Sequence, residues 1–332
     1  MKFFVGLILT MACSLSFAAD LSVPFKGFVN VAPGRDLYVD YVPATAGQPT
    51  VILLNGLTYS TVQWDPFVKA LRTKGVGVFR YDMYGMGQTL LKYAPMTDVI
   101  LPQNQITDLK ALLTNFGMAA PYNIAGLSYG GGIAAGYAAL YPEDIQNLIM
   151  MSPFTEPLSS QVNMINQEIA STRLMFPYNP ASDDELYDYF LKQIVYMTYP
   201  SAEPNVVDNP YILEAVFRMA QGMRNFIPLK SAASLRVKAL HLMVADKDQY
   251  IPQAVFDTYW NAVPVTSRAS EIHIADSEHK MDQAVPNFAS DWVYQILVGN
   301  PALFQGQSFL GSPFSGVVQN ASGQSLFRLG HD

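Results

Sequence analysis

The feature that most constrains this chain is a Gly-x-Ser-x-Gly pattern formed by Gly126, Ser128 and Gly130. The apolar run at residues 121–125 predicts a short buried strand before it, and the small-residue run at 129–141 predicts a closely packed helix after it. Such a pattern also occurs by chance in glycine-rich turns before ordinary helices. The strand and helix around it favour a sharp turn that exposes the serine hydroxyl, because glycines let the two elements approach closely.

Ser128 is therefore the candidate nucleophile. A serine hydroxyl is a weak nucleophile at neutral pH, so it needs a base and donors for the developing oxyanion. In a strand–turn–helix arrangement the backbone N–H of the following residue, Tyr129, points toward that oxyanion.

Apolar runs alternate with helical patterns along most of the chain. Residues 27–31 and 35–42 predict an opening antiparallel hairpin around a Pro-Gly turn. Further strands are predicted at 50–54, 76–81, 121–125, 147–151, 237–244 and 270–274, and helices at 62–74, 105–116, 253–263 and 281–298. This alternation predicts an α/β fold with a doubly wound, mostly parallel sheet, whose site lies beyond the carboxyl ends of the strands.

The alternation stops between residues 155 and 235, where several helices rich in Met, Tyr and Phe are predicted as a lid insertion. These side chains either line an apolar substrate pocket or pack the lid onto the main domain, and packing is favoured for any single one. The expected organisation is therefore a signal peptide at 1–19, a core at 20–154, the lid at 155–235, the second part of the core at 236–300 and a tail at 301–332. For the tail the residues indicate no definite structure.

The N-terminus resembles a secretory signal. Lys2 precedes an apolar run at 3–12, and Ser16 and Ala18 offer the small residues of a cleavage site near Ala18 or Ala19. The run is too short to span a bilayer, so no stable membrane anchor is expected. Cys13 is the only cysteine and would leave with the signal, so the mature chain would form neither a disulfide nor a thiolate metal site. We expect a secreted or periplasmic protein, of bacterial origin.

Composition excludes one class of partner. The 332 residues carry a net charge of −7, and no predicted helix carries a Lys/Arg cluster, which argues against nucleic-acid binding. A small-molecule substrate is the expected partner, and nothing in the sequence indicates an oligomeric state.

The base and acid for Ser128 are found by elimination among few candidates. Of the four histidines, His241 and His273 lie inside predicted strands and His331 lies in the tail. His279 follows a strand onto the same rim of the sheet as Ser128, which makes it the best base. Asp248 and Asp246 both follow another strand onto that rim. Asp248 is the better candidate for the acid and Asp246 its competitor.

Over nearly all of its mature length, the chain resembles the α/β-hydrolase superfamily. Its elbow serine, acid loop and late histidine occur in the order that is typical of that superfamily. The resemblance implies that Asp248, four residues before Pro252, is the acid and that Asp246 is not catalytic. Residues 81–89 resemble a D-x-x-G-x-G-x-S segment, in which Thr89 displaces the usual serine. Residues 53–57 resemble an apolar strand ending in His-Gly, with Asn55 in place of histidine.

The same resemblance implies that the backbone N–H groups of Leu57 and Tyr129 bind the oxyanion. Asn55 would hydrogen-bond the loop instead of the missing histidine. No metal and no cofactor are implied. A serine nucleophile also disfavours the haloalkane and epoxide chemistries of the superfamily, which use aspartate.

The expected function is an exported serine hydrolase that cleaves ester-type bonds of small hydrophobic substrates through an acyl-enzyme. Lactonase, peptidase and acyltransferase activities remain open. The alternative from another class is a non-catalytic protein that keeps the fold and binds a small apolar ligand, and Asn55 is the residue that most favours it. A metallohydrolase is disfavoured because the chain has no H-x-H or H-x-x-x-H spacing.

Overall fold

The computed structural model describes residues 19–202, 209 and 211–332, and within them 11 strands form one sheet. The strands are β1 (Phe25–Ala32), β2 (Arg35–Val42), β3 (Thr50–Leu54), β4 (Gly77–Asp82), β5 (Tyr122–Leu127), β6 (Ile145–Met151), β7 (Leu240–Ala245), β8 (Arg268–Ile274), β9 (Gln307–Ser312), β10 (Val317–Asn320) and β11 (Ser325–Arg328). Their order is β1-β2-β4-β3-β5-β6-β7-β8-β9-β10-β11. Pairing is parallel from β4 through β9 and antiparallel at both ends, so the predicted mostly parallel sheet is confirmed.

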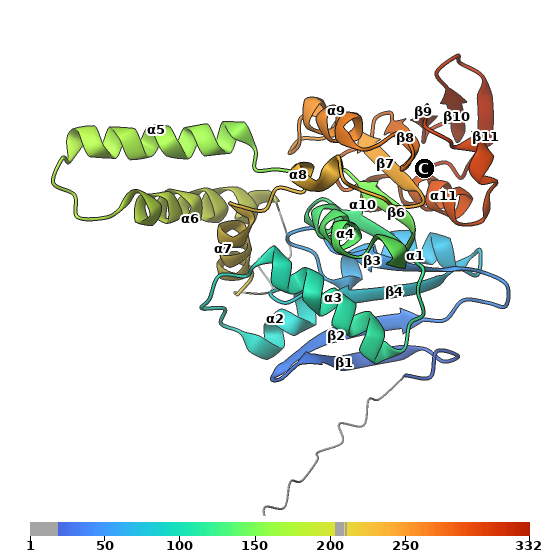
Figure 1. The fold of residues 1–332 in the computed structure, drawn as a ribbon, viewed down its shortest axis with the longest axis horizontal. Coiled ribbons are helices and arrows are strands. Elements are labelled where there is room, and N and C mark those ends of the chain that lie inside the picture. Colours follow the sequence, from blue (N-terminus) through green and yellow to red (C-terminus); the bar gives the residue numbers. More distant parts are fainter. Residues whose placement is uncertain (1–18, 203–208, 210) are drawn as a thin grey trace, which may run out of the picture.

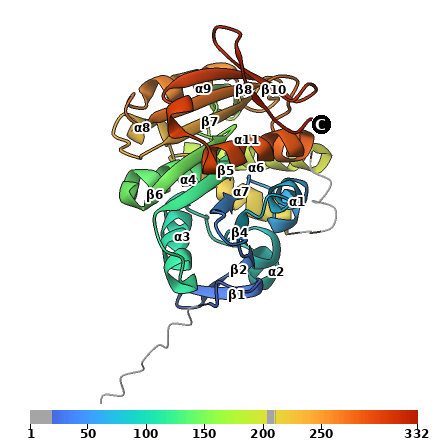
Figure 2. The same ribbon diagram turned by 90° about the vertical axis from the view of Figure 1, so that its right-hand side faces the viewer.

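Helices cover both faces of the sheet (Figure 2). On one side lie α1 (Asp65–Arg72) and α11 (Pro286–Val298), and on the other lie α3 (Pro102–Phe116), α4 (Tyr129–Leu140), α8 (Leu229–Ala232) and α9 (Gln253–Ala262). Short elements complete this layer arrangement: η1 (Thr61–Trp64), α2 (Gly87–Tyr93), η2 (Pro142–Asp144), α10 (Met281–Ala284) and η4 (Pro301–Leu303).

Each central strand supplies both cores, because successive side chains point to opposite faces. On β3, Ile52 and Leu54 join the cluster under α3 and α4, whereas Val51 and Leu53 join the cluster under α1 and α11. All four side chains are at most 1% exposed. A strand buried on both faces is therefore apolar at every position, as the sequence of β3 is.

The predicted closing helix at 281–298 is wrong in one respect, because it consists of two helices. α10 ends at Ala284 and α11 begins at Pro286. Between them Val285 has φ −139° and ψ 57°, outside the helical region. Proline lacks an N–H and disfavours the helical conformation of the preceding residue, so the chain restarts a helix at Pro286.

The C-terminal segment, for which the sequence indicated no structure, continues the main sheet. β9 pairs in parallel with β8, and β10 and β11 follow as an antiparallel meander. Phe309 and Phe304 pack edge-on against Trp292 of α11, with ring centroids 5.2 and 5.4 Å apart from it. Burial of these isolated aromatic residues orders a stretch whose Gly- and Ser-rich sequence has no clear periodicity.

Four described helices lie between β6 and β7 in the chain, all within the region predicted as a lid. α5 (Ser159–Met175), α6 (Asp183–Ala202) and α7 (Ile212–Met223) form the insertion, whereas α8 packs on the body of the sheet. Figure 1 shows α5 and α6 side by side, extending away from the body. A capping box opens α6, because the N–H of Ser182 donates to Glu185 at 2.7 Å and the N–H of Glu185 donates to the Ser182 hydroxyl at 3.2 Å.

The Met- and aromatic-rich lid residues divide into three groups instead of the two that were expected. Phe217 and Met219 are buried against the body, and Tyr187 and Met223 line cavities. A larger set is exposed: Met164, Met175, Phe176, Tyr189, Tyr196 and Met197. The projecting shape of α5 and α6 leaves this third group in solvent, which a periodicity argument does not anticipate.

The predicted signal peptide at residues 1–19, which includes Cys13, lies outside the described residues except for Ala19. Among the helices that the structure describes, none combines the length and the apolar character that a bilayer span requires.

Candidate active site

Ser128 stands on a strained turn between β5 and α4. Its φ of 52° and ψ of −116° are rare for a residue with a side chain and cost about 1–3 kcal/mol. Three backbone hydrogen bonds hold the turn: Ser128 N–H donates to Met151 at 2.9 Å, and the Ser128 carbonyl accepts from Gly132 at 3.2 Å and Phe154 at 2.8 Å. The conformation is therefore imposed by the neighbouring β6 and α4.

The two glycines of the pattern are required by backbone contact. A Cβ atom on Gly126 would lie 2.3 Å from the carbonyl oxygen of Gly130, and one on Gly130 would lie 2.3 Å from the carbonyl oxygen of Leu54. A side-chain movement cannot relieve either clash, because the atoms that the Cβ would meet belong to the backbone. This close packing lets β3, β5 and α4 meet beneath Ser128.

His279 and Asp248 form a buried pair. Nδ1 of His279 lies 2.7 Å from Oδ2 of Asp248, and the two side chains are 6% and 3% exposed. The other oxygen, Oδ1, accepts from the backbone N–H groups of Tyr250 at 2.9 Å and Ile251 at 2.8 Å. A carboxylate only accepts, so Nδ1 carries the proton and Nε2 of the neutral ring is left as an acceptor.

Burial opposes the charge on Asp248 and acts to raise its pKa. The hydrogen bond and charge of His279, together with the two backbone N–H groups, outweigh burial and lower the pKa of Asp248 below its ordinary value. The carboxylate is thus held ionised and oriented toward the imidazole. The Tyr250 ring packs edge-on against His279 with centroids 5.0 Å apart and fixes the other side of the ring.

The remaining histidines have other surroundings. His241 is buried beside the Ser270 hydroxyl at 2.7 Å, and burial lowers its pKa to about 3. His273 lies 3.6 Å from Glu271, and the hydrogen bond with Glu271 raises the pKa of His273. His331 is exposed. Neither these residues nor the exposed Asp246 belong to the walls of the cavity at Ser128.

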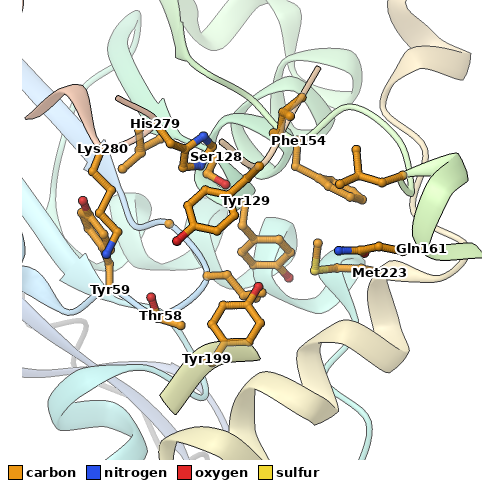
Figure 3. A pocket seen from close by; sticks show the side chains of 16 residues that line it. Thr58, Tyr59, Ser128, Tyr129, Phe154, Gln161, Tyr199, Met223, His279 and Lys280 are labelled. Carbon is orange, nitrogen blue, oxygen red and sulfur yellow. The ribbon is translucent and has the colours of Figure 1, made fainter. Parts of the chain in front are cut away.

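Ser128, Tyr129, Leu57 and His279 line one cavity of about 130 Å³ at the carboxyl edge of the sheet. Figure 3 shows the Ser128 hydroxyl beside the His279 ring. Leu57 reaches the cavity from the loop after β3, and Tyr129 is the first residue of α4. The buried Tyr129 hydroxyl donates to Gln105 at 2.5 Å and anchors that helix end. Leu57, Ser128 and His279 reach one place because parallel strands end at one edge.

Asn55 faces away from this cavity. Its side chain is fully buried, donates to the Tyr81 carbonyl at 3.1 Å and accepts from the Trp64 indole at 2.9 Å. It therefore ties the loop after β3 to β4 and η1. Asp82 completes this support by accepting from the N–H groups of Thr61 at 2.6 Å and Gln88 at 2.8 Å.

Three residues of the site were missed by sequence reasoning: Tyr59, Lys280 and Asp282. Tyr59 and Lys280 line the cavity, and the Tyr59 hydroxyl donates to Oδ1 of the buried Asp282 at 3.1 Å. Burial raises the pKa of Asp282 to about 7. This bond joins the Leu57 loop to the His279 loop. In the sequence, Tyr59 lies close to Leu57 and Asp282 lies close to His279, which could have marked both as candidates. Their separation in the chain means that the sequence alone does not indicate a contact between them.

Across residues 19–202, 209 and 211–332, no three His, Cys, Asp or Glu side chains gather in a way that could hold a metal ion.

A protein-family comparison identifies the relationship that this geometry suggests. The model described as serine aminopeptidase, S33, matches residues 46–278, more than two thirds of the chain. The chain belongs to this family of α/β hydrolases. The match includes the elbow, the Leu57 loop and Asp248, and ends one residue before His279.

Similar individual proteins are more distant. The cis-3-alkyl-4-alkyloxetan-2-one decarboxylase of Shewanella oneidensis is 27% identical over 174 residues, which are 51% of this chain and 53% of that protein. The chain thus spans about half the length of this curated relative.

Solved structures show the same fold. An α/β hydrolase from a Medee basin deep-sea metagenome library has a TM-score of 0.62 at 19% identity, covering 82% of this chain and 98% of that one. A thermophilic esterase from Thermogutta terrifontis has a TM-score of 0.59 at 16% identity, covering 82% and 97%. At these identities the likeness concerns the α/β-hydrolase fold alone.

Proposed function

We propose that this α/β hydrolase is a serine hydrolase that cleaves carboxylic-ester bonds of small hydrophobic substrates. The observation that carries the proposal is the buried Asp248–His279 pair, whose ring shares a cavity with the strained Ser128. A purely structural histidine has no need of an ionised, doubly anchored carboxylate on one nitrogen and a cavity on the other.

The proposed reaction has two halves. Oγ of Ser128 attacks the carbonyl carbon while Nε2 of His279 takes the hydroxyl proton, and Asp248 stabilises the imidazolium. The oxyanion accepts from the backbone N–H groups of Leu57 and Tyr129. Nε2 then returns the proton to the alcohol oxygen as the ester C–O bond breaks. In the second half, a water molecule attacks the acyl-enzyme carbonyl while Nε2 of His279 takes its proton. Nε2 then returns the proton to Oγ of Ser128 as the acyl C–O bond breaks and the acid is released. No metal or cofactor takes part in this scheme.

The non-catalytic alternative loses its main support. Asn55 favoured a ligand-binding protein because histidine is usual at that position in the superfamily. Its side chain, however, is satisfied by Tyr81 and Trp64 and does not face the cavity. The exchange therefore concerns how the loop is braced, not the chemistry at Ser128.

One distant relative agrees with an ester-type carbonyl as the target. The decarboxylase from Shewanella is named for an oxetan-2-one, which is a cyclic ester. We further propose that the chain is exported to the periplasm or secreted, from the signal-like residues 1–19.

A fluorophosphonate probe tests the proposal directly, because it reacts with activated serines. We expect a mass adduct on Ser128 in the folded protein and none in Ser128→Ala. Ser159→Ala is the matched control, since that serine is exposed on α5 outside the cavity, and it should label like the parent. Folded protein without an adduct, and without turnover of p-nitrophenyl acetate, would favour the binding protein.

A further inference from the structure

A second cavity, the lid cavity, adjoins the one at Ser128. Its volume is about 90 Å³, and it lies between α5, α6 and α7. Both cavities are walled in part by Leu158, Gln161, Tyr199 and Met223. The space at Ser128 therefore continues toward the interior of the lid.

The lid cavity suits an uncharged, apolar ligand. Ile165 on α5 and Val195 on α6 are 1% and 2% exposed and form its wall. The charged residue in that wall, Arg224, is already engaged: its guanidinium lies 2.9 Å from Asp184 and 3.9 Å above the Tyr187 ring. Apart from Gln161, Tyr187 and Tyr199, the rest of the wall consists of apolar side chains, so apolar burial is the main interaction that the cavity offers.

The chemistry at Ser128 decides which half of an ester can reach it. The alcohol oxygen must lie near His279, which gives it a proton, so the alcohol leaves on the side of His279 and Lys280. Figure 3 shows these two residues on one side of Ser128, and Gln161 and Met223 on the other. The acyl chain runs away from the leaving alcohol and therefore toward the lid cavity.

We propose that the lid cavity binds the acyl chain of a medium-chain fatty-acid ester, whose alcohol portion lies in the more polar region near Thr58, Tyr59 and Lys280. This inference rests on the proposed esterase function and adds the substrate class. The lid cavity of about 90 Å³ is several times larger than the roughly 10–15 Å³ that a single water needs, so it has room for part of an alkyl chain. Val195 would then be a specificity-determining residue.

The test is a series of p-nitrophenyl esters from acetate to laurate with the full-length protein. We expect kcat/KM to rise at least about tenfold from acetate to octanoate, because each methylene that leaves water contributes up to about fourfold. Beyond the length that the lid cavity accepts, kcat/KM should fall again.

Two substitutions at one position should move that optimum in opposite directions. Val195→Phe fills the lid cavity and should lower the decanoate-to-acetate ratio of kcat/KM about tenfold. Val195→Ala enlarges it and should raise the laurate-to-octanoate ratio. Ratios within one enzyme cancel differences in folded fraction. Met197→Phe is the control, because Met197 lies on the same helix, is 76% exposed and is outside the lid cavity.

The outcomes separate this inference from the proposed function. If Ser128 is labelled and acetate is hydrolysed, but both Val195 variants keep the ratios of Met197→Phe, the lid cavity does not hold the acyl chain and only this inference fails. If Ser128 is not labelled and no ester in the series is hydrolysed, both proposals fail together.

Discussion

Replacing Asp282 by asparagine is expected to stabilise the protein at alkaline pH. Asp282 is fully buried at the start of α10, and its Oδ1 accepts from the Tyr59 hydroxyl. Its other oxygen, Oδ2, has no partner among the described residues. Removal of this carboxyl from water raises its pKa from 3.8 to about 7, against the smaller opposing effects of Tyr59 and Lys280.

The size and sign of the effect follow from this pKa difference. The unfolded chain loses the Asp282 proton near pH 3.8, whereas the folded chain keeps it until about pH 7. Between these values the folded state binds the extra proton, so the free energy of unfolding falls as pH rises and levels off above pH 7. Each pKa unit corresponds to about 1.4 kcal/mol, which gives a loss of about 4 kcal/mol at pH 8. Asparagine stays neutral and keeps an oxygen for Tyr59.

Urea unfolding at pH 8 and pH 5 measures the prediction. Asp282→Asn should exceed the parent by up to about 4 kcal/mol at pH 8 and by about 2 kcal/mol at pH 5, because only part of the loss has developed there. The control Asp98→Asn changes an exposed carboxyl, so its free energy of unfolding should equal that of the parent at both pH values. An Asp282→Asn variant that gains nothing at pH 8, or gains equally at both pH values, would refute the reasoning.

Three further substitutions test the site and its support. Asp248→Asn should lower kcat about 10⁴-fold, because an amide stabilises the wrong imidazole tautomer, whereas Asp246→Asn should stay within a few-fold; a p-nitrophenyl ester assay showing the reverse order would move the acid role to Asp246. Gly126→Ala should lower the free energy of unfolding in urea by about 3 kcal/mol or more, because the new Cβ meets a backbone oxygen at 2.3 Å. The control Gly56→Ala should be tolerated, because its Cβ would meet its nearest neighbours at 3.6 Å. Equal stability of the two variants would contradict the packing argument. Asn55→Ala should lose about 1–3 kcal/mol for each buried partner left unsatisfied, and a thermal melt unchanged from the parent would show that its two hydrogen bonds are dispensable.

Local patterns in the sequence determined the fold class and the position of the nucleophile. The elbow is encoded within five residues. At positions 126 and 130 only glycine fits, because a Cβ at either position would lie 2.3 Å from a backbone oxygen. The parallel sheet follows from strands that are apolar at every position, such as β3, alternating with helical periods. Such signals depend on neighbours in the chain, so one sequence suffices to recognise them.

The sequence favoured Asp248 over Asp246 only by resemblance, because both follow β7 and differ by two positions in a loop. The contact between Asp248 and His279 is visible only in the tertiary structure. The bond between Tyr59 and Asp282 joins residues 223 positions apart. The lid cavity and the strands β9 to β11 likewise depend on which distant segments bury one another. Periodicity reports which face of an element is apolar, but the partner of that face is set by packing across the whole chain.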